Sequence, residues 1–241
     1  MTIFKFPQLK DQYGFTGDAT PSSGIITVPK VKLVGEVFDG ATIDSNFWTT
    51  SATVGTVAQV ASELVLTSGT ASTNNAKVYT VQRAFWVPGT SNKWRTQMRI
   101  ASSDNDVTLR MGMGWGASMP TVTDGCYFKI VGSTISVNTM FATAETSVAS
   151  GSFNGTYTAP TLTNNNVFEI LATLGKVYFL INNVIVHTAT FSTAGWFSGT
   201  ANFHAFADVI NTGVSAAIAY TFRTLSIARL GEAYSTPTYK N

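Results

Sequence analysis

Charged side chains are scarce in this sequence. They make up 12% of its 241 residues, about half of the roughly 25% usual in soluble proteins. The 15 basic and 13 acidic residues nearly balance, so the net charge is only +2. Such a surface carries no strong electric field. We therefore expect no nucleic-acid partner.

Cysteine is almost absent as well. Cys126 is the only one, so neither an internal disulfide nor a zinc site of three or four cysteines can form. A buried, inert thiol is the expected state of Cys126. Asp104, Asn105 and Asp106 offer the oxygen ligands that calcium prefers, but the glycine and distal glutamate of an EF-hand loop are missing. We predict no bound metal and no cofactor.

Long apolar runs are missing too. The most apolar stretch, residues 176–187, is interrupted at Asn182, and no run approaches the roughly 18 residues of a membrane span. The first ten residues contain Lys5, Pro7 and Lys10, where a signal peptide would have its apolar region. We therefore expect no membrane partner and no signal peptide. The single cysteine favours a reducing cytoplasm, or a particle assembled there.

The polar surface comes from hydroxyl groups, since 36 residues are threonine, a β-branched type that suits strands. Short alternating segments recur every 8–12 residues or so, with glycine, asparagine and serine between them, which is typical of an antiparallel sandwich or barrel. No segment shows a helical period. The expected strands are 31–38, 54–60, 63–67, 77–87, 94–101, 107–115, 126–131, 134–141, 167–173, 176–181, 184–191, 200–207 and 218–230.

Two parts of the chain differ in character. Residues 1–30 hold three of the seven prolines and show neither strand nor helix periodicity, so we predict an extended N-terminal arm there. Residues 31–241 are predicted to form one β-sandwich domain. The arm carries four aromatic side chains that need a surface to cover them, either on its own domain or on a neighbouring subunit: Phe4, Phe6, Tyr13 and Phe15.

One hairpin can be located from its turn residues. Strands 176–181 and 184–191 are separated by Asn182 and Asn183, and asparagine tolerates the positive φ angles of a two-residue hairpin turn. With the segment 167–173, these strands predict a three-stranded meander.

Segment 38–48 reads FDGATIDSNFW, segment 177–183 reads VYFLINN, and segment 220–228 forms a closing strand. Together they resemble the concanavalin A-like family of legume lectins, laminin G domains and laminarinases, over roughly residues 36–230. The resemblance implies an all-β, antiparallel jelly-roll sandwich. It describes a fold and not an activity.

Family members that cut polysaccharides carry the motif E-x-D-x-x-E on one strand, where alternation puts the acids on one face. None of the five glutamates here is followed two residues later by an acid. His187 and His204, the two histidines, lie in expected strands and are more typical of satisfied structural residues than of catalytic bases. No G-x-S-x-G elbow is present. We therefore predict that the protein is not an enzyme and has no catalytic residues.

Two places are candidate contact sites. Trp196 and Phe197 lie in a glycine-flanked loop, which makes them an exposed contact or glycan-binding patch in this interpretation. In segment 110–116, alternation puts Arg110 on the glycine-bearing face of a strand, opposite the face of Met111, Met113 and Trp115. That face lets another backbone or a ligand approach closely, and Arg110 is placed to clamp a carboxylate.

Two functions remain open at this point. An aromatic arm before a low-charge sandwich resembles structural proteins of phage virions. That interpretation predicts a non-enzymatic capsid decoration or tail-associated subunit that is located in the virion, binds other virion proteins and forms homo-oligomers. The alternative is a lectin-like module that binds glycans through the patch of Trp196, Phe197 and Arg110.

Overall fold

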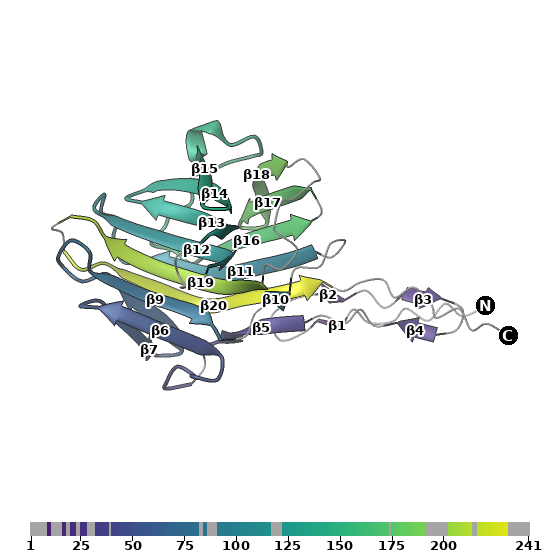
Figure 1. Cartoon of the computed structure of the whole chain (residues 1–241), viewed down its shortest axis with the longest axis horizontal. Coiled ribbons are helices and arrows are strands. Elements are labelled where there is room, and N and C mark those ends of the chain that lie inside the picture. The colour runs from purple at the N-terminus through teal and green to yellow at the C-terminus, as the bar shows by residue number, and fades with distance from the viewer. Residues whose placement is uncertain are drawn as a thin grey trace.

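The computed structural model describes most of the chain in twelve ranges. These are residues 9–10, 16–17, 20–22, 25–27, 32–38, 40–81, 84–85, 91–116, 122–173, 175–190, 202–213 and 216–230. Two sheets of eight strands each stack face to face (Figure 1).

The strands of the stacked sheets are β5 (Lys32–Val37), β6 (Trp48–Thr53), β7 (Thr56–Val60), β8 (Glu63–Thr67), β9 (Asn75–Thr80), β10 (Ala84–Phe85), β11 (Ser91–Ile100), β12 (Val107–Trp115), β13 (Asp124–Val131), β14 (Thr134–Phe141), β15 (Ala144–Ala149), β16 (Asn166–Thr173), β17 (Lys176–Ile181), β18 (Val184–Thr190), β19 (Asn202–Asn211) and β20 (Ala219–Leu230). One short 3₁₀ helix, η1 (Ser150–Ser152), follows β15.

Each sheet is antiparallel and is named here after a central strand. The β12 sheet has the order β15-β14-β13-β12-β19-β9-β6, with β10 also paired to β19. The β11 sheet has the order β18-β17-β16-β11-β20-β8-β7, with β5 also paired to β20. The chain passes from one sheet to the other eight times, between β5 and β6, β6 and β7, β8 and β9, β10 and β11, β11 and β12, β15 and β16, β18 and β19, and β19 and β20. The two sheets therefore fold as one unit.

Strict alternation of side chains builds the core between the sheets. Along β11 every second residue is buried, and the inward side chains of β12 join the same cluster. Phe128 of β13 packs edge-on against Phe168 and Phe179 of the opposite sheet, with ring centroids 5.1 and 5.4 Å apart. Such aromatic pairs add to the stabilisation from area burial alone, so Phe128 links the two layers.

The meander and its turn are confirmed. Strands β16, β17 and β18 are neighbours in the β11 sheet, and Asn182 and Asn183 have φ angles of 51° and 66°. Two strands of the stacked sheets, β6 and β15, were not predicted from the sequence. Both lie at the ends of the β12 sheet, where their mostly exposed side chains show no apolar alternation.

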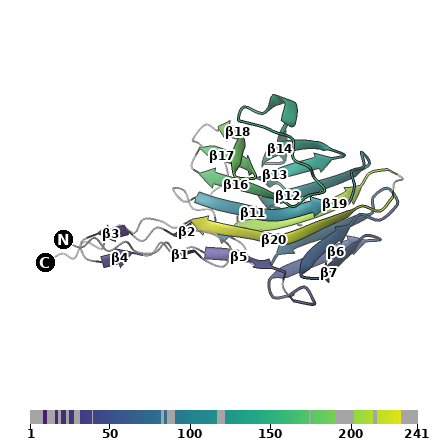
Figure 2. The same cartoon turned by 180° about the vertical axis from the view of Figure 1, so that it is seen from behind.

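Two further pairs of short strands lie beyond one end of the sandwich (Figures 1 and 2). They are β1 (Leu9–Lys10) with β2 (Thr16–Gly17), and β3 (Thr20–Ser22) with β4 (Ile25–Thr27). The four aromatic residues of the predicted arm, Phe4, Phe6, Tyr13 and Phe15, lie outside the described residues, so the arm stays a prediction. Within the described ranges, no helix has the length and hydropathy needed to cross a membrane.

Candidate functional site

The outer face of the β12 sheet carries three rows of side chains that run across its strands. Strand register defines each row. The charged row is Lys77, Asp208, Arg110, Lys129 and Ser136. The aromatic row is Tyr79, Phe206, Gly112, Tyr127, Asn138 and Ser147. The glycine row is His204, Gly114, Gly125, Met140 and Glu145.

An ion pair stands at the centre of the charged row. Arg110 donates from Nε to Asp208 Oδ1 at 3.0 Å and from Nη2 to Oδ2 at 2.5 Å. The Asp208 side chain is 0% exposed although it faces outward. Burial raises the pKa of the Asp208 carboxyl, against the charge and hydrogen bonds of Arg110. The guanidinium itself stays protonated, and the charge of Asp208 raises the pKa of Arg110 despite the burial of that side chain.

Glycine at position 112 permits the close approach of β12 and β13. A Cβ atom there would clash with the Cys126 carbonyl oxygen and lie 2.6 Å from Tyr127 Cα, distances that no side chain tolerates. With no side chain between them, Tyr127 and Phe206 pack edge-on across Gly112, with ring centroids 6.0 Å apart. The aromatic row thus depends on this glycine.

A small apolar cluster covers the middle of the face. Val122, Tyr127 and Phe206 are buried, and Tyr79 and Met140 are half-buried around them. Val122 lies over the glycine row, where its Cγ1 would be 2.7 Å from a Cβ on Gly114. The glycine-bearing face predicted from the sequence is therefore partly filled by a side chain of this chain.

A second acid reaches the same face from the edge strand β15. The Tyr127 hydroxyl donates to Glu145 Oε1 at 2.8 Å. Burial, together with this hydrogen bond, raises the pKa of Tyr127. Glu145 also acts on the pKa of Arg110 through its charge, so Arg110, Asp208, Tyr127 and Glu145 form one electrostatic cluster.

The residues predicted as contact sites are only partly placed. Arg110 lies on the outer face, as alternation predicts, and clamps Asp208 of its own chain. Trp196 and Phe197 lie outside the described residues, so the patch that includes them stays a prediction. Trp48 and Trp94 are buried in the core, and Trp115 packs against it.

The other candidates for chemistry have structural partners. His204 donates from Nδ1 to the Thr80 carbonyl oxygen at 2.5 Å in a buried position. Cys126 is buried, and its burial raises the pKa of its thiol. Across the described part of the chain, no group of three or more His, Cys, Asp or Glu is arranged to hold a metal ion.

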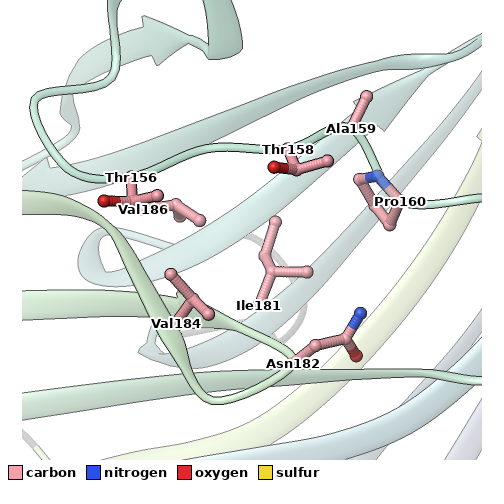
Figure 3. A pocket seen from close by; sticks show the side chains of 8 residues that line it. All are labelled: Thr156, Thr158, Ala159, Pro160, Ile181, Asn182, Val184 and Val186. Atoms are coloured by element: carbon pink, nitrogen blue, oxygen red, sulfur yellow. The ribbon is translucent and has the colours of Figure 1, made fainter.

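A hollow of about 210 Å³ lies beside the β17–β18 turn (Figure 3). Thr156, Thr158 and Pro160 border it on one side, and Ile181 and Val184 on the other. It contains no titratable side chain. The Asn182 amide at its rim is already used, because it accepts from the Val167 N–H and donates to Asn166 Oδ1. We therefore place the candidate site on the β12 sheet instead.

No family model and no curated protein sequence matches this chain, but solved structures do. The catalytic domain of an endo-1,3-β-glucanase (laminarinase) from Thermotoga petrophila RKU-1 matches with a TM-score of 0.62 and 13% identity, covering 85% of this chain and 100% of that one. The laminarinase from Rhodothermus marinus gives 0.63 and 13%, covering 85% and 99%. A GH16 protein of a mixed-linkage glucan locus in Bacteroides ovatus, bound to product, gives 0.60 and 10%, covering 80% and 98%.

At these identities the matches establish the fold. It is an all-β, antiparallel jelly-roll sandwich of the concanavalin A-like type, as the sequence predicted.

Two predictions from the sequence are contradicted. The structures that match are glycoside hydrolases, so the prediction of a structural virion protein, a capsid decoration or tail-associated subunit, is wrong. The prediction that the chain is not an enzyme is contradicted on the same ground. Virion partners and homo-oligomers find no support either. The virion prediction failed because a neutral, hydroxyl-rich surface suits a sugar polymer as well as a protein. The prediction of no enzyme rested on a motif within one strand, and such a motif does not detect acids that lie on separate strands.

The Arg110–Asp208 pair generates a first prediction. The substitution Asp208→Asn leaves the guanidinium of Arg110, whose side chain is 22% exposed, without its counter-charge, which costs at most about 3–5 kcal/mol of unfolding free energy. Urea denaturation measures this loss.

The matched control is Glu63→Gln. Glu63 also binds an arginine, Arg99, through both oxygens at 2.6 Å, but the Arg99 side chain is 34% exposed. Glu63 is half-buried and also contacts Arg223 Nε at 3.4 Å, but water reaches both arginines, so we expect a loss nearer the roughly 1 kcal/mol of a surface pair. Equal losses in the two variants would show that the outer-face pair is not shielded from water.

His187 generates a prediction about pH. Burial lowers its pKa from the ordinary value of 6.5, so the folded chain favours the neutral imidazole. Below pH 6.5 the unfolded chain takes up the proton first, and stability that is fully present above this pH is lost as the pH falls. We expect the melting temperature to fall more between about pH 8 and pH 5 in the natural chain than in His187→Gln. Parallel curves would contradict this assignment.

Proposed function

We propose that the protein binds a neutral polysaccharide of the β-glucan type across the outer face of the β12 sheet. The observation that carries the proposal is the set of three rows on that face. Neighbouring strands lie about 4.8 Å apart, so each row forms a continuous track across several strands, and a polymer laid along it meets a new side chain at every strand.

The chemistry of the accessible groups fits a sugar chain. A sugar ring has apolar faces, which pack on aromatic and apolar side chains, and hydroxyls, which need a few placed polar groups. Tyr79 and Met140 offer half-buried apolar surface. Lys77, Arg110 and Lys129 line the same face, and their cations donate hydrogen bonds.

The face is also held in shape before any ligand arrives. Arg110 is fixed by Asp208, and Tyr127 by Glu145. Side chains that are already ordered lose little conformational entropy on binding. The fold gives further support, since the matching enzymes are described as acting on 1,3-β-glucan, and the Bacteroides ovatus structure holds a mixed-linkage glucan product.

Tyr79 provides the test of binding. We expect the chain to bind laminarin in affinity electrophoresis, and Tyr79→Ala to weaken binding about five- to tenfold, equivalent to roughly 1–1.4 kcal/mol of lost stacking. The matched control is Tyr178→Ala, because Tyr178 is a half-buried tyrosine on the outer face of the other sheet. No retardation by laminarin or mixed-linkage glucan, or an equal loss in both variants, would contradict the proposal.

Hydrolysis of the bound glycan is a second candidate, which the exposed carboxylate of Glu145 on this face favours. Glycosidases generally set two carboxyl groups on either side of the scissile bond. Arg110 binds both oxygens of Asp208, whereas Glu145 lies exposed at the edge. Glu145 is therefore the acid open to substrate.

If this candidate holds, the chain releases reducing ends from laminarin. Glu145→Gln then lowers that rate at least about 100-fold while affinity electrophoresis still shows binding. The control Glu63→Gln, on the other sheet, retains the rate. Binding without any release of reducing ends would leave a glycan-binding protein and reject hydrolysis.

A further inference from the structure

A separate hollow opens between the two sheets, where strands β14 and β15 of one sheet face β17 and β18 of the other. Its volume is about 380 Å³, within the range of roughly 300–1,000 Å³ typical of ligand pockets. Figures 1 and 2 both show these four strands together at one side of the sandwich. We call this hollow the side pocket. It is distinct from the outer face, because its inward side chains point between the sheets.

Two pairs of side chains face each other across the side pocket. Thr139 and Thr146 are register partners on β14 and β15, and alternation turns both inward with Val137 and Val148. On the opposite wall Phe179 and His187 are partners on β17 and β18. The pocket thus has two hydroxyls on one wall and an imidazole on the other, where the Phe179 ring is fully buried behind the surface.

The bulge in β18 is what brings the imidazole to the pocket. The register between β17 and β18 shifts at Phe179 and Leu180, so that Val186 and His187 are both buried although they are adjacent. A regular strand would turn one of the two outward. The bulge therefore aims His187 at the space between the sheets.

The protonation of His187 follows from its one hydrogen bond. Its Nδ1 accepts from the Asn154 N–H at 3.4 Å, so the proton of the neutral imidazole sits on Nε2, which is left as a donor. The side-chain hydroxyls of Thr139 and Thr146 have no hydrogen-bond partner among the described residues. Three polar groups are thus free to bind a ligand.

The rest of the lining is uncharged. Thr188 and Thr190 lie in it beside Val137, Val148 and Ala189, and the lining contains no Asp, Glu, Lys or Arg. A charged ligand would find no counter-charge here and would lose its hydration. The lining selects a neutral molecule that has both apolar faces and hydroxyl groups.

The side pocket is also rigid at its open edge. The segment after η1 runs along β18, where the Gly155 N–H donates to the Val186 carbonyl oxygen at 2.9 Å. Asn154 holds Thr188 through both of its side-chain groups, at 2.8 and 2.9 Å. These bonds fix the wall that carries His187 before any ligand binds.

We infer that the side pocket binds one neutral pyranose residue. The apolar face of the ring packs on the half-buried Val148 and Ala189, its hydroxyls exchange hydrogen bonds with Thr139 and Thr146, and one hydroxyl oxygen accepts from His187 Nε2–H. The residue is either a free monosaccharide or the end of a glycan chain, since both present the same ring.

Amide chemical shifts of the isotope-labelled chain, titrated with methyl β-D-glucopyranoside, provide the test. We expect saturable shifts at Thr139, Thr146, His187 and Ala189. The substitution Thr139→Val removes one hydroxyl at constant shape and weakens binding about five- to tenfold, whereas Ala189→Phe fills the hollow and abolishes the shifts. The control Thr134→Val lies on the same strand at an exposed position and leaves binding unchanged.

Two further ligands distinguish a free monosaccharide from the end of a glycan chain, and a sugar from a merely apolar ring. Tighter binding of laminaritriose than of the monosaccharide identifies a chain end, and equal binding identifies a single residue. Cyclohexanol has a ring of the same size with one hydroxyl. Equal affinity for cyclohexanol would overturn the inference, because the site would then select apolar volume only.

The test is independent of the proposed outer-face function. Tyr79→Ala does not alter the side-pocket shifts, and Ala189→Phe does not alter laminarin retardation on the outer face. Absence of saturable shifts at the side pocket, or their persistence in Ala189→Phe, would overturn the inference and leave the outer-face proposal standing.

Discussion

Asp208 is excluded from water on the outer face of the β12 sheet, and that burial constrains everything around it. A buried carboxylate is stable only beside a positive charge, and Arg110 of the neighbouring strand supplies one at 2.5 Å. Holding both groups in register requires β12 and β19 to pair without a slip, because a slip of one residue would turn Arg110 into the core. The ion pair therefore fixes both the register and the polarity of this face.

The same face depends equally on glycines, which leave space where other residues would place a side chain. Gly112 lets Tyr127 and Phe206 meet across β12, and the neighbouring glycine row leaves room that Val122 partly fills. A sheet face built in this way has its aromatic side chains clustered and its polar groups paired before a ligand binds. This face suits a weakly polar polymer because its side chains are already ordered, and not because it carries many charges.

Local sequence pattern predicts what alternation and turn chemistry control. It places Arg110 and the glycines on one face of β12, and it finds the Asn182–Asn183 turn. It cannot pair residues that are distant along the chain, and Arg110 and Asp208 are 98 positions apart. Asp208 itself lies one residue beyond the expected end of its strand. Glu145 lies on β15, whose exposed side chains carry no apolar period because the strand is held by backbone hydrogen bonds to β14.

Composition predicts the kind of surface but not its partner. A surface poor in charge and rich in hydroxyls has little hydration to lose, which favours close packing against any neutral, hydrogen-bonding partner, whether protein or sugar. What separates the two is geometry. A protein interface needs a broad apolar centre, whereas the outer face has half-buried Tyr79 and Met140 among separated polar groups, spaced by the strands. That spacing suits a repeating chain of small amphipathic rings, and it becomes visible only once the strands are in register.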